Sequence, residues 1–400
     1  MLTVFTQDIN CADDAVSETL EKLDAARADE KFTMENSLGV LHCHPECAEN
    51  GTVKALCERG AEKGLMPFDV VGCVSHKVGA PGMDSSDGLV LSVLTGAVFA
   101  TAVSRPAETG GMKHAMNELH VNVMSEFTRR TAPEAKPEMF TTFMPFSDTF
   151  DIYAAITEMD NVTRIANGVP MFGAVSFSGE TNEGKSFTIR NGQVYPSSVV
   201  VAALGGVNPR WLSASIPDKN VVNIDAKVTE MDGSVLKKVN GVPIEDFLVA
   251  ASIIEKDSVD ALKYWPLTFD QPDGTRITRS CVGYDDKGGM ILSTPVKLGS
   301  SVNIASMTPT DVNETARATL NGIMEADPRS GVLIYSCTAR MWQLAFDGDA
   351  ELNAVAEILG DTPYSLAYCG GEIFPQFLRS SGQPKVVNSL QNNTIIACVL

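Results

Sequence analysis

The feature that most constrains the fold is an internal repeat. Three segments share an apolar strand, a polar turn, an amphipathic helix, a second strand that ends in small residues, and a third strand. They span residues 39–94, 139–204 and 331–399. Near-continuous apolar strands that alternate with amphipathic helices are typical of sheets covered by helices. The repeat predicts an α/β (mixed α+β) fold built from three strand–helix–strand–strand units in two lobes.

A β-rich segment separates the second and third copies of the repeat. Residues 221–228 alternate like a strand, and Asp232-Gly233 and Asn240-Gly241 are hairpin signals. We therefore expect three parts along the chain. An N-terminal strand and helix extension spans 1–34. A domain with two repeat units spans 35–245, and a domain with the β-rich insertion and the third unit spans 246–400.

The charge and cysteine content exclude several classes of protein. The 400 residues include 31 Lys and Arg against 50 Asp and Glu, which gives a net charge of −19. A field of this sign repels nucleic acids and anionic membrane surfaces, so neither is an expected partner. No apolar run reaches the roughly 20 residues of a membrane span. The nine cysteines are an odd number, which favours reduced thiols and predicts a cytoplasmic location.

Four pieces of sequence give the chain a resemblance to a known family. They are Val70-Val-Gly-Cys-Val-Ser-His76, the junction Asn240-Gly-Val-Pro-Ile-Glu245, Trp265-Pro-Leu267 with Arg279 and Gly288, and Tyr335-Ser-Cys-Thr-Ala-Arg340 with Gly370-Gly-Glu-Ile373. In this order they resemble the FIST sensory family, with its N-terminal and C-terminal modules, over residues 35 to 400.

The resemblance implies a sensory module for small ligands such as amino acids. Some relatives pair with kinases, and some bind haem and respond to nitric oxide. We recognise no kinase, cyclase or methyl-acceptor output region in this sequence. We therefore expect a standalone sensor that signals through a partner protein. The alternative is an adaptor or scaffold protein that binds no small ligand.

The C-terminal unit holds the ligand site that we expect. Arg340 follows a predicted strand end, and Glu372 follows a Gly-Gly turn after the next repeat strand. An arginine can hold a carboxylate and a glutamate can hold an ammonium, so the two suit an amino acid. Ser336, Tyr368 and the backbone of Gly370 and Gly371 would orient it. The competing interpretation is a structural Arg–Glu ion pair.

Histidines support a second hypothesis, in which the protein binds haem as a gas sensor. His76, His42 and His44 are the candidate axial ligands, because haem iron is often held by histidine. A metal site is not expected, because the ligand-rich segment 42–47 lacks a second close ligand pair downstream. We expect no enzyme activity, because neither a phosphate-binding glycine fingerprint nor a G-x-S-x-G elbow is present.

Overall fold

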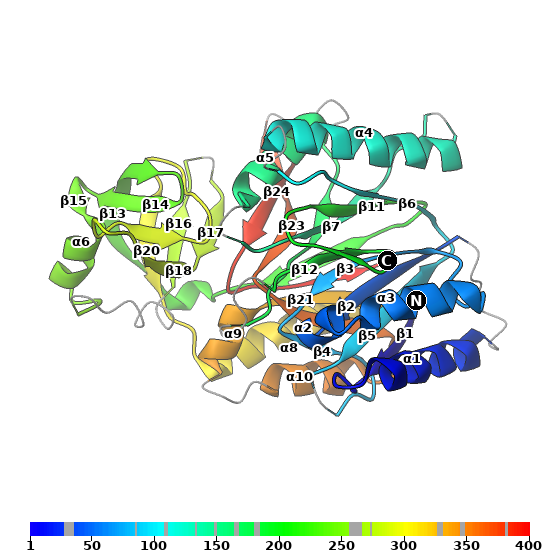
Figure 1. The fold of residues 1–400 in the computed structure, drawn as a ribbon. Helices are drawn as coiled ribbons and strands as arrows, with labels where there is room; N and C mark the ends of the chain where they lie inside the picture. The colour runs from blue at the N-terminus through cyan, green and yellow to red at the C-terminus, as the bar shows by residue number, and fades with distance from the viewer. Residues whose placement is uncertain are drawn as a thin grey trace.

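The computed structural model describes most of the chain (Figure 1). The described residues are 1–27, 36–84, 86–107, 111–132, 134–147, 150–163, 168–179, 185–255, 266–272, 274–325, 331–344, 349–380 and 383–400. Trp265 lies outside them. Helices and strands are mixed, as the repeat predicts, and three sheets form the main body beside a separate all-β sheet. No helix in these ranges is both long and apolar enough to cross a membrane.

Each unit is longer than the predicted repeat, because one more strand and helix precede it. The first unit consists of β1 (Leu2–Thr6), α1 (Ala12–Arg27), β2 (Ser37–Cys43), α2 (Pro45–Glu49), α3 (Thr52–Glu62), β3 (Asp69–Val74) and β5 (Leu89–Thr95). Its sheet has the order β1-β5-β2-β3, in which only β2 and β3 are parallel. The segment 1–34 thus supplies an edge strand and a covering helix to the first unit.

The second and third units repeat this order. The second consists of β6 (Val98–Val103), α4 (Met112–Arg130), β7 (Met139–Met144), α5 (Ile152–Thr163), β8 (Met171–Val175) and β11 (Val200–Gly205). The third consists of β12 (Arg210–Ala214), α8 (Pro309–Glu325), β21 (Val332–Cys337), α9 (Thr338–Gln343), α10 (Ala350–Leu359), β22 (Tyr364–Cys369) and β25 (Ile395–Val399). The β-rich insertion therefore lies inside the third unit, after its first strand.

The insertion forms a small β-domain with its own apolar core. It consists of β13 (Val221–Asp232), β14 (Val235–Val239), β15 (Val242–Pro243), α6 (Ile244–Ala250), β16 (Leu267–Asp270), β17 (Arg276–Arg279), β18 (Cys281–Tyr284), β19 (Met290–Leu292) and β20 (Ser301–Ala305), preceded by a short 3₁₀ helix, Asp218–Asn220. Figure 1 shows it beside the main body. The expected division after residue 245 falls within α6.

The three units exchange strands in a cycle. Behind its second parallel strand, each unit sends a strand into a neighbouring sheet: β4 (Lys77–Gly79) pairs with β22, β9 (Thr188–Arg190) with β3, and β23 (Gly371–Ser380) with β8. β9 forms a hairpin with β10 (Gln193–Tyr195), and β23 forms a hairpin with β24 (Gln383–Gln391). Because each sheet contains a strand of another unit, no unit has a complete sheet by itself.

A ring of backbone hydrogen bonds closes the cycle at the carboxyl ends of the parallel strands. Each unit accepts one of these bonds at a carbonyl oxygen and donates another from an N–H. The donating residue lies two positions after the accepting residue of the same unit. The bonds run from Phe177 N to Val74 O (3.2 Å), from Gly370 N to Val175 O (2.9 Å) and from His76 N to Tyr368 O (3.1 Å). The same pattern in all three units shows that they are related by a pseudo-threefold axis.

Three rings pack against one another at this axis. His42, Phe143 and Tyr335 occupy matching positions on β2, β7 and β21, and all three are fully buried. Their ring centroids lie 5.3 to 6.2 Å apart in edge-to-face arrangements. The surrounding core draws apolar side chains from all three sheets. Helices cover the outer sheet faces: α1 and α3, α4 and α5, and α8 and α10.

Local sequence explains where two of these helices begin. The Asp151 carboxylate accepts a hydrogen bond from Ala154 N (2.8 Å) at the start of α5, which satisfies a free amide of the first turn. Before α8, Thr308 and Asp311 exchange hydrogen bonds between side chain and backbone in both directions (3.0 and 3.2 Å). This reciprocal capping fixes the start of the helix that packs on the third sheet.

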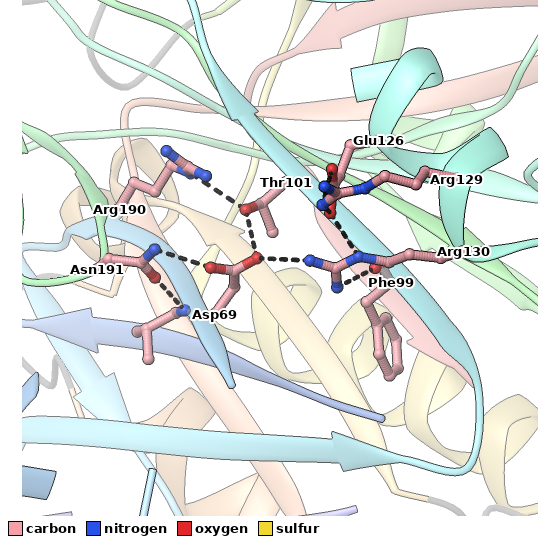
Figure 2. A network of polar contacts seen from close by, with 9 residues as sticks. Asp69, Phe99, Thr101, Glu126, Arg129, Arg130, Arg190 and Asn191 are labelled. Atoms are coloured by element: carbon pink, nitrogen blue, oxygen red, sulfur yellow. Dashed lines mark hydrogen bonds and ion pairs between the residues drawn. The ribbon is translucent and has the colours of Figure 1, made fainter. Parts of the chain in front are cut away.

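A polar network joins the first and second units (Figure 2). Asp69 on β3 accepts hydrogen bonds from Thr101 Oγ1 (2.9 Å) and Asn191 Nδ2 (2.8 Å), and Arg130 Nη2 lies 3.7 Å from the same carboxylate. Arg190 Nε donates to Thr101 Oγ1 (3.1 Å). The network therefore ties two sheets together from four chain segments.

Replacing Asp69 by asparagine tests how much this network contributes to the free energy of unfolding. The carboxylate accepts from several donors, so its loss should lower the free energy of unfolding by about 1–2 kcal/mol. The measurement is urea unfolding followed by circular dichroism. Asp232→Asn, at an exposed ion pair of the small β-domain, is the control and should cost less than about 0.5 kcal/mol. Equal effects of the two changes would contradict a structural role for the network.

Candidate ligand-binding site

The carboxyl ends of the three parallel strand pairs converge near the pseudo-threefold axis. Ser75, Ser176 and Cys369 directly follow the three acceptors of the backbone ring, and all three are fully buried. In α/β folds, ligands bind outside the carboxyl ends of parallel strands. The third unit differs from the other two here, because charged side chains gather around its strand ends.

Arg340 lies on α9, which begins directly after β21, and it is fully buried. Its Nε and Nη2 donate to Glu351 Oε1 at 2.9 and 2.6 Å. Nη2 also contacts Val312 O (3.0 Å) and Thr315 Oγ1 (3.1 Å). The charge of Arg340 is thus balanced by Glu351 in a buried ion pair, and no hydrogen bond joins Arg340 to Glu372 among the described residues.

Ser336 and Tyr368 belong to the same buried cluster. Ser336 Oγ donates to Glu351 Oε2 (2.6 Å). Burial raises the pKa of Tyr368 well above its usual range, and the negative charge of Glu351 raises it further. The Tyr368 hydroxyl and Arg340 Nη1 have no hydrogen-bond partner among the described residues. These side chains lie on the face of the sheet that α8 and α10 cover.

Sequence reasoning missed Glu351, although a signal for it exists. Glu351 is in the first turn of α10, and Ala354 and Val355 follow at helical spacing on the buried face. A carboxylate on the apolar face of a helix needs a buried partner, because an unpaired buried charge is costly.

Glu372 lies on the other side of the strand ends. It is fully buried at the start of β23, and Cys369 Sγ lies 3.4 Å from its Oε1. Burial raises the pKa of Glu372 well above its usual range; the Cys369 contact and the charge of Arg340 oppose this increase without cancelling it. Burial likewise raises the pKa of the Cys369 and Cys337 thiols. The carboxyl of Glu372 therefore favours its protonated form.

Two buried oxygen atoms in this region lack hydrogen-bond donors. They are Glu372 Oε2 and Asn393 Oδ1, and within the described ranges neither has a partner. Asn393 has a backbone φ of 54°, and it follows Asn392, whose Nδ2 donates to Gly370 O (3.3 Å). Unsatisfied buried acceptors are rare in native structures, so each of these oxygens has the capacity to accept a further hydrogen bond.

Gly370 and Gly371 allow the chain segments to approach one another here. A Cβ at Gly371 would lie 2.9 Å from Leu390 Cδ1 and 3.0 Å from Gln391 O, closer than a side chain allows. Gly370 supplies its amide to the backbone ring. The missing side chain of Gly371 therefore allows β23 to approach the end of β24, whereas Gly370 faces Ser176 and Phe177 of the second unit.

The small β-domain closes this region from outside. Ser293 Oγ donates to Asn392 Oδ1 (2.6 Å), and Arg279 Nη1 donates to Leu390 O (3.0 Å). Arg279 is only 4% exposed and has no carboxylate partner among the described residues. Its Nε has no partner in the same ranges, and burial lowers its pKa to about 10. We name Glu372, Asn392 and Asn393 the junction cluster; Arg279 contacts the same end of β24, at Leu390 O.

The candidate haem ligands occupy three different surroundings. His42 is inside the aromatic core, with Nδ1 3.7 Å from Cys73 Sγ, and its Nε2 has no partner in the described part of the chain. Burial lowers the pKa of His42 to about 3. His44 accepts a hydrogen bond from Glu46 N (3.4 Å) at the start of α2, and His76 packs against Phe177. Within the described residues, Asp8, Cys11 and Asp14 form the one cluster with metal-ligand spacing, at the surface.

Fold and cluster together define a mixed α/β protein with pseudo-threefold symmetry and a buried polar cluster at its strand ends. Family models identify it further: the FIST N domain matches residues 40–242, and the FIST C domain matches residues 246–375. The chain belongs to the FIST family, which is associated with sensing in signal transduction.

Other comparisons add little about function. No curated protein matches the chain. The structure is similar to that of a cyanuric acid hydrolase from A. caulinodans, over 99% of this chain and 98% of that one, at 11% sequence identity and a TM-score of 0.32. These values are too low to support an argument about fold or activity.

Proposed function

We propose that this protein is a cytoplasmic sensor of a small ligand that carries both an amine and a carboxylate, such as an amino acid. The observation that carries the proposal is that two buried oxygens, Glu372 Oε2 and Asn393 Oδ1, have no hydrogen-bond partner among the residues that the structure describes. A protonated amine has three N–H donors and a positive charge, so it would satisfy both oxygens and neutralise Glu372.

The raised pKa of Glu372 gives this binding step a pH dependence. In the empty site the carboxyl keeps its proton, because burial disfavours the charged form. An incoming ammonium group favours the carboxylate, so binding releases this proton. The affinity should therefore rise with pH between the ordinary pKa of glutamate and the raised one.

Arg279 is the better partner for the carboxylate end of the ligand. Arg340 has the right chemistry, but Glu351 already balances its charge. Arg279 has no such partner in the described part of the chain and lies beside Leu390, next to the two asparagines. A ligand carboxylate would neutralise this buried guanidinium.

Signalling would use the small β-domain. Two of its residues, Arg279 and Ser293, contact the β24 end directly. A ligand that binds between them and Glu372 favours the arrangement of the two parts that it fits, and a partner protein would recognise that arrangement. The high pKa of both thiols near the cluster supports binding over nucleophilic chemistry, because the thiolate is the reactive form.

The test is calorimetric titration of the wild type with the L-amino acid that raises its melting temperature most in a panel of twenty. Glu372→Gln keeps the shape of the side chain but removes its charge, and it should weaken binding at least about tenfold. Arg279→Gln should have a similar effect.

Two matched controls separate the site from general charge effects. Arg276→Gln changes the exposed arginine on the same strand as Arg279, and Glu357→Gln changes an exposed carboxylate on α10. Both should leave the affinity unchanged. Failure of all twenty amino acids to bind, or equal affinities for Glu372→Gln and the wild type, would contradict the proposal.

A further inference from the structure

A cavity lies at the end of the pseudo-threefold axis opposite the junction cluster. The β5–β6 turn, the β11–β12 turn and the end of β25 surround a volume of about 470 Å³. These strands end beside the amino ends of the parallel strands, because β5, β11 and β25 are antiparallel to β2, β7 and β21. The cavity is therefore separate from the junction cluster.

The cavity has apolar walls and a polar rim. Leu94, Phe99 and Val399 are buried apolar residues that line it, and Thr95 and Asn208 add polar groups. Volumes of this size accommodate small organic molecules, and a few convergent polar groups orient them.

Arg210 gives the cavity a charge. It is exposed at the start of β12, where its backbone pairs with Val399, and its side chain has no hydrogen bond or ion pair among the described residues. Other exposed arginines of this acidic chain are paired with carboxylates, among them Arg59, Arg276 and Arg317. Because the Arg210 guanidinium is unpaired in a chain of net charge −19, it is available to bind an anion.

We propose that this cavity is a second ligand site, for a small organic anion with an apolar body. The guanidinium of Arg210 holds the anionic group, and the apolar walls cover the remainder of the ligand. The proposal does not depend on the junction cluster or on the amino-acid ligand.

The probe for this site is 1-anilinonaphthalene-8-sulfonate, an aromatic anion whose fluorescence rises on binding. The wild type should bind it saturably. Arg210→Gln should weaken binding about tenfold, because it removes a charge-assisted contact. Ala97→Trp, which places a ring at the β5–β6 turn that lines the cavity, should abolish binding.

Three controls make the result specific. Arg317→Gln removes an exposed arginine elsewhere and should not change the affinity, and Glu372→Gln should not change it either. The uncharged analogue N-phenyl-1-naphthylamine should bind wild type and Arg210→Gln equally. Melting curves establish that each variant is folded. Absence of saturable binding, or equal affinity of wild type and Arg210→Gln for the sulfonate, would overturn the proposal.

Discussion

Replacing Arg340 by methionine is expected to lower the free energy of unfolding by about 3–5 kcal/mol, because it leaves the Glu351 carboxylate buried without a cation. The pair is fully buried on both sides and joined at 2.6 Å. Ser336 also donates a hydrogen bond to Glu351, so the substitution affects more than one contact of this carboxylate. Urea unfolding at neutral pH measures the effect.

Arg317→Met is the matched control. Arg317 on α8 pairs at the surface with Glu357 on α10, the helix that also carries Glu351. An exposed pair of this kind contributes at most about 1 kcal/mol. If Arg340→Met were as stable as Arg317→Met, the buried pair could not be a structural element, and Arg340 would again be available for a ligand.

The second large effect concerns pH. His42 is expected to make the folded state lose about 2–3 kcal/mol of stability between pH 7 and pH 4.5. Its pKa is about 3 in the fold against 6.5 in the unfolded chain, because burial disfavours the imidazolium. The unfolded state therefore binds more protons below pH 6.5, and stability falls as the pH falls.

The variant His42→Phe isolates this contribution. Phenylalanine is the residue at the matching position of the second unit, and it does not titrate. The difference in unfolding free energy between pH 7 and pH 4.5 should be smaller than in the wild type by about 2–3 kcal/mol, whatever the change in packing costs at both pH values. His114→Asn, on the exposed side of α4, should leave the difference unchanged. A pH dependence of His42→Phe like that of the wild type would mean that His42 is not buried as a neutral ring.

Much of the fold follows from the sequence, because the strands are buried on both faces and therefore appear as apolar runs. The first strand and helix of each unit are harder to recognise. In the third unit the small β-domain separates β12 from α8, so the shared order of elements is hidden there. The exchange of β4, β9 and β23 is also invisible in the sequence, because each strand contacts the other sheet through only three paired residues, which carry no local signal.

The candidate site, like the fold, could be predicted from the sequence only in part. The sequence points to the strand ends of the third unit, and the structure places Arg340, Ser336 and Tyr368 together there. Alternation along a strand separates them from Cys369, which faces the axis while Tyr368 faces the helices. Glu372 follows Cys369 on the axis side. Two contacts depend on tertiary packing and cannot be predicted from the residue pattern of a single strand. They are the pairing of Arg340 with Glu351 and the contact of Arg279 with β24.

The most direct test of the account is hydrogen exchange of the wild type with and without the amino acid that binds most tightly. A ligand in the junction cluster should slow exchange of the amides in residues 276–281 and 387–394, at the contact between the small β-domain and the third unit. This protection is the predicted result. Protection confined to any other region, with these two segments unchanged, would contradict the claim that the ligand binds at Glu372 and Arg279.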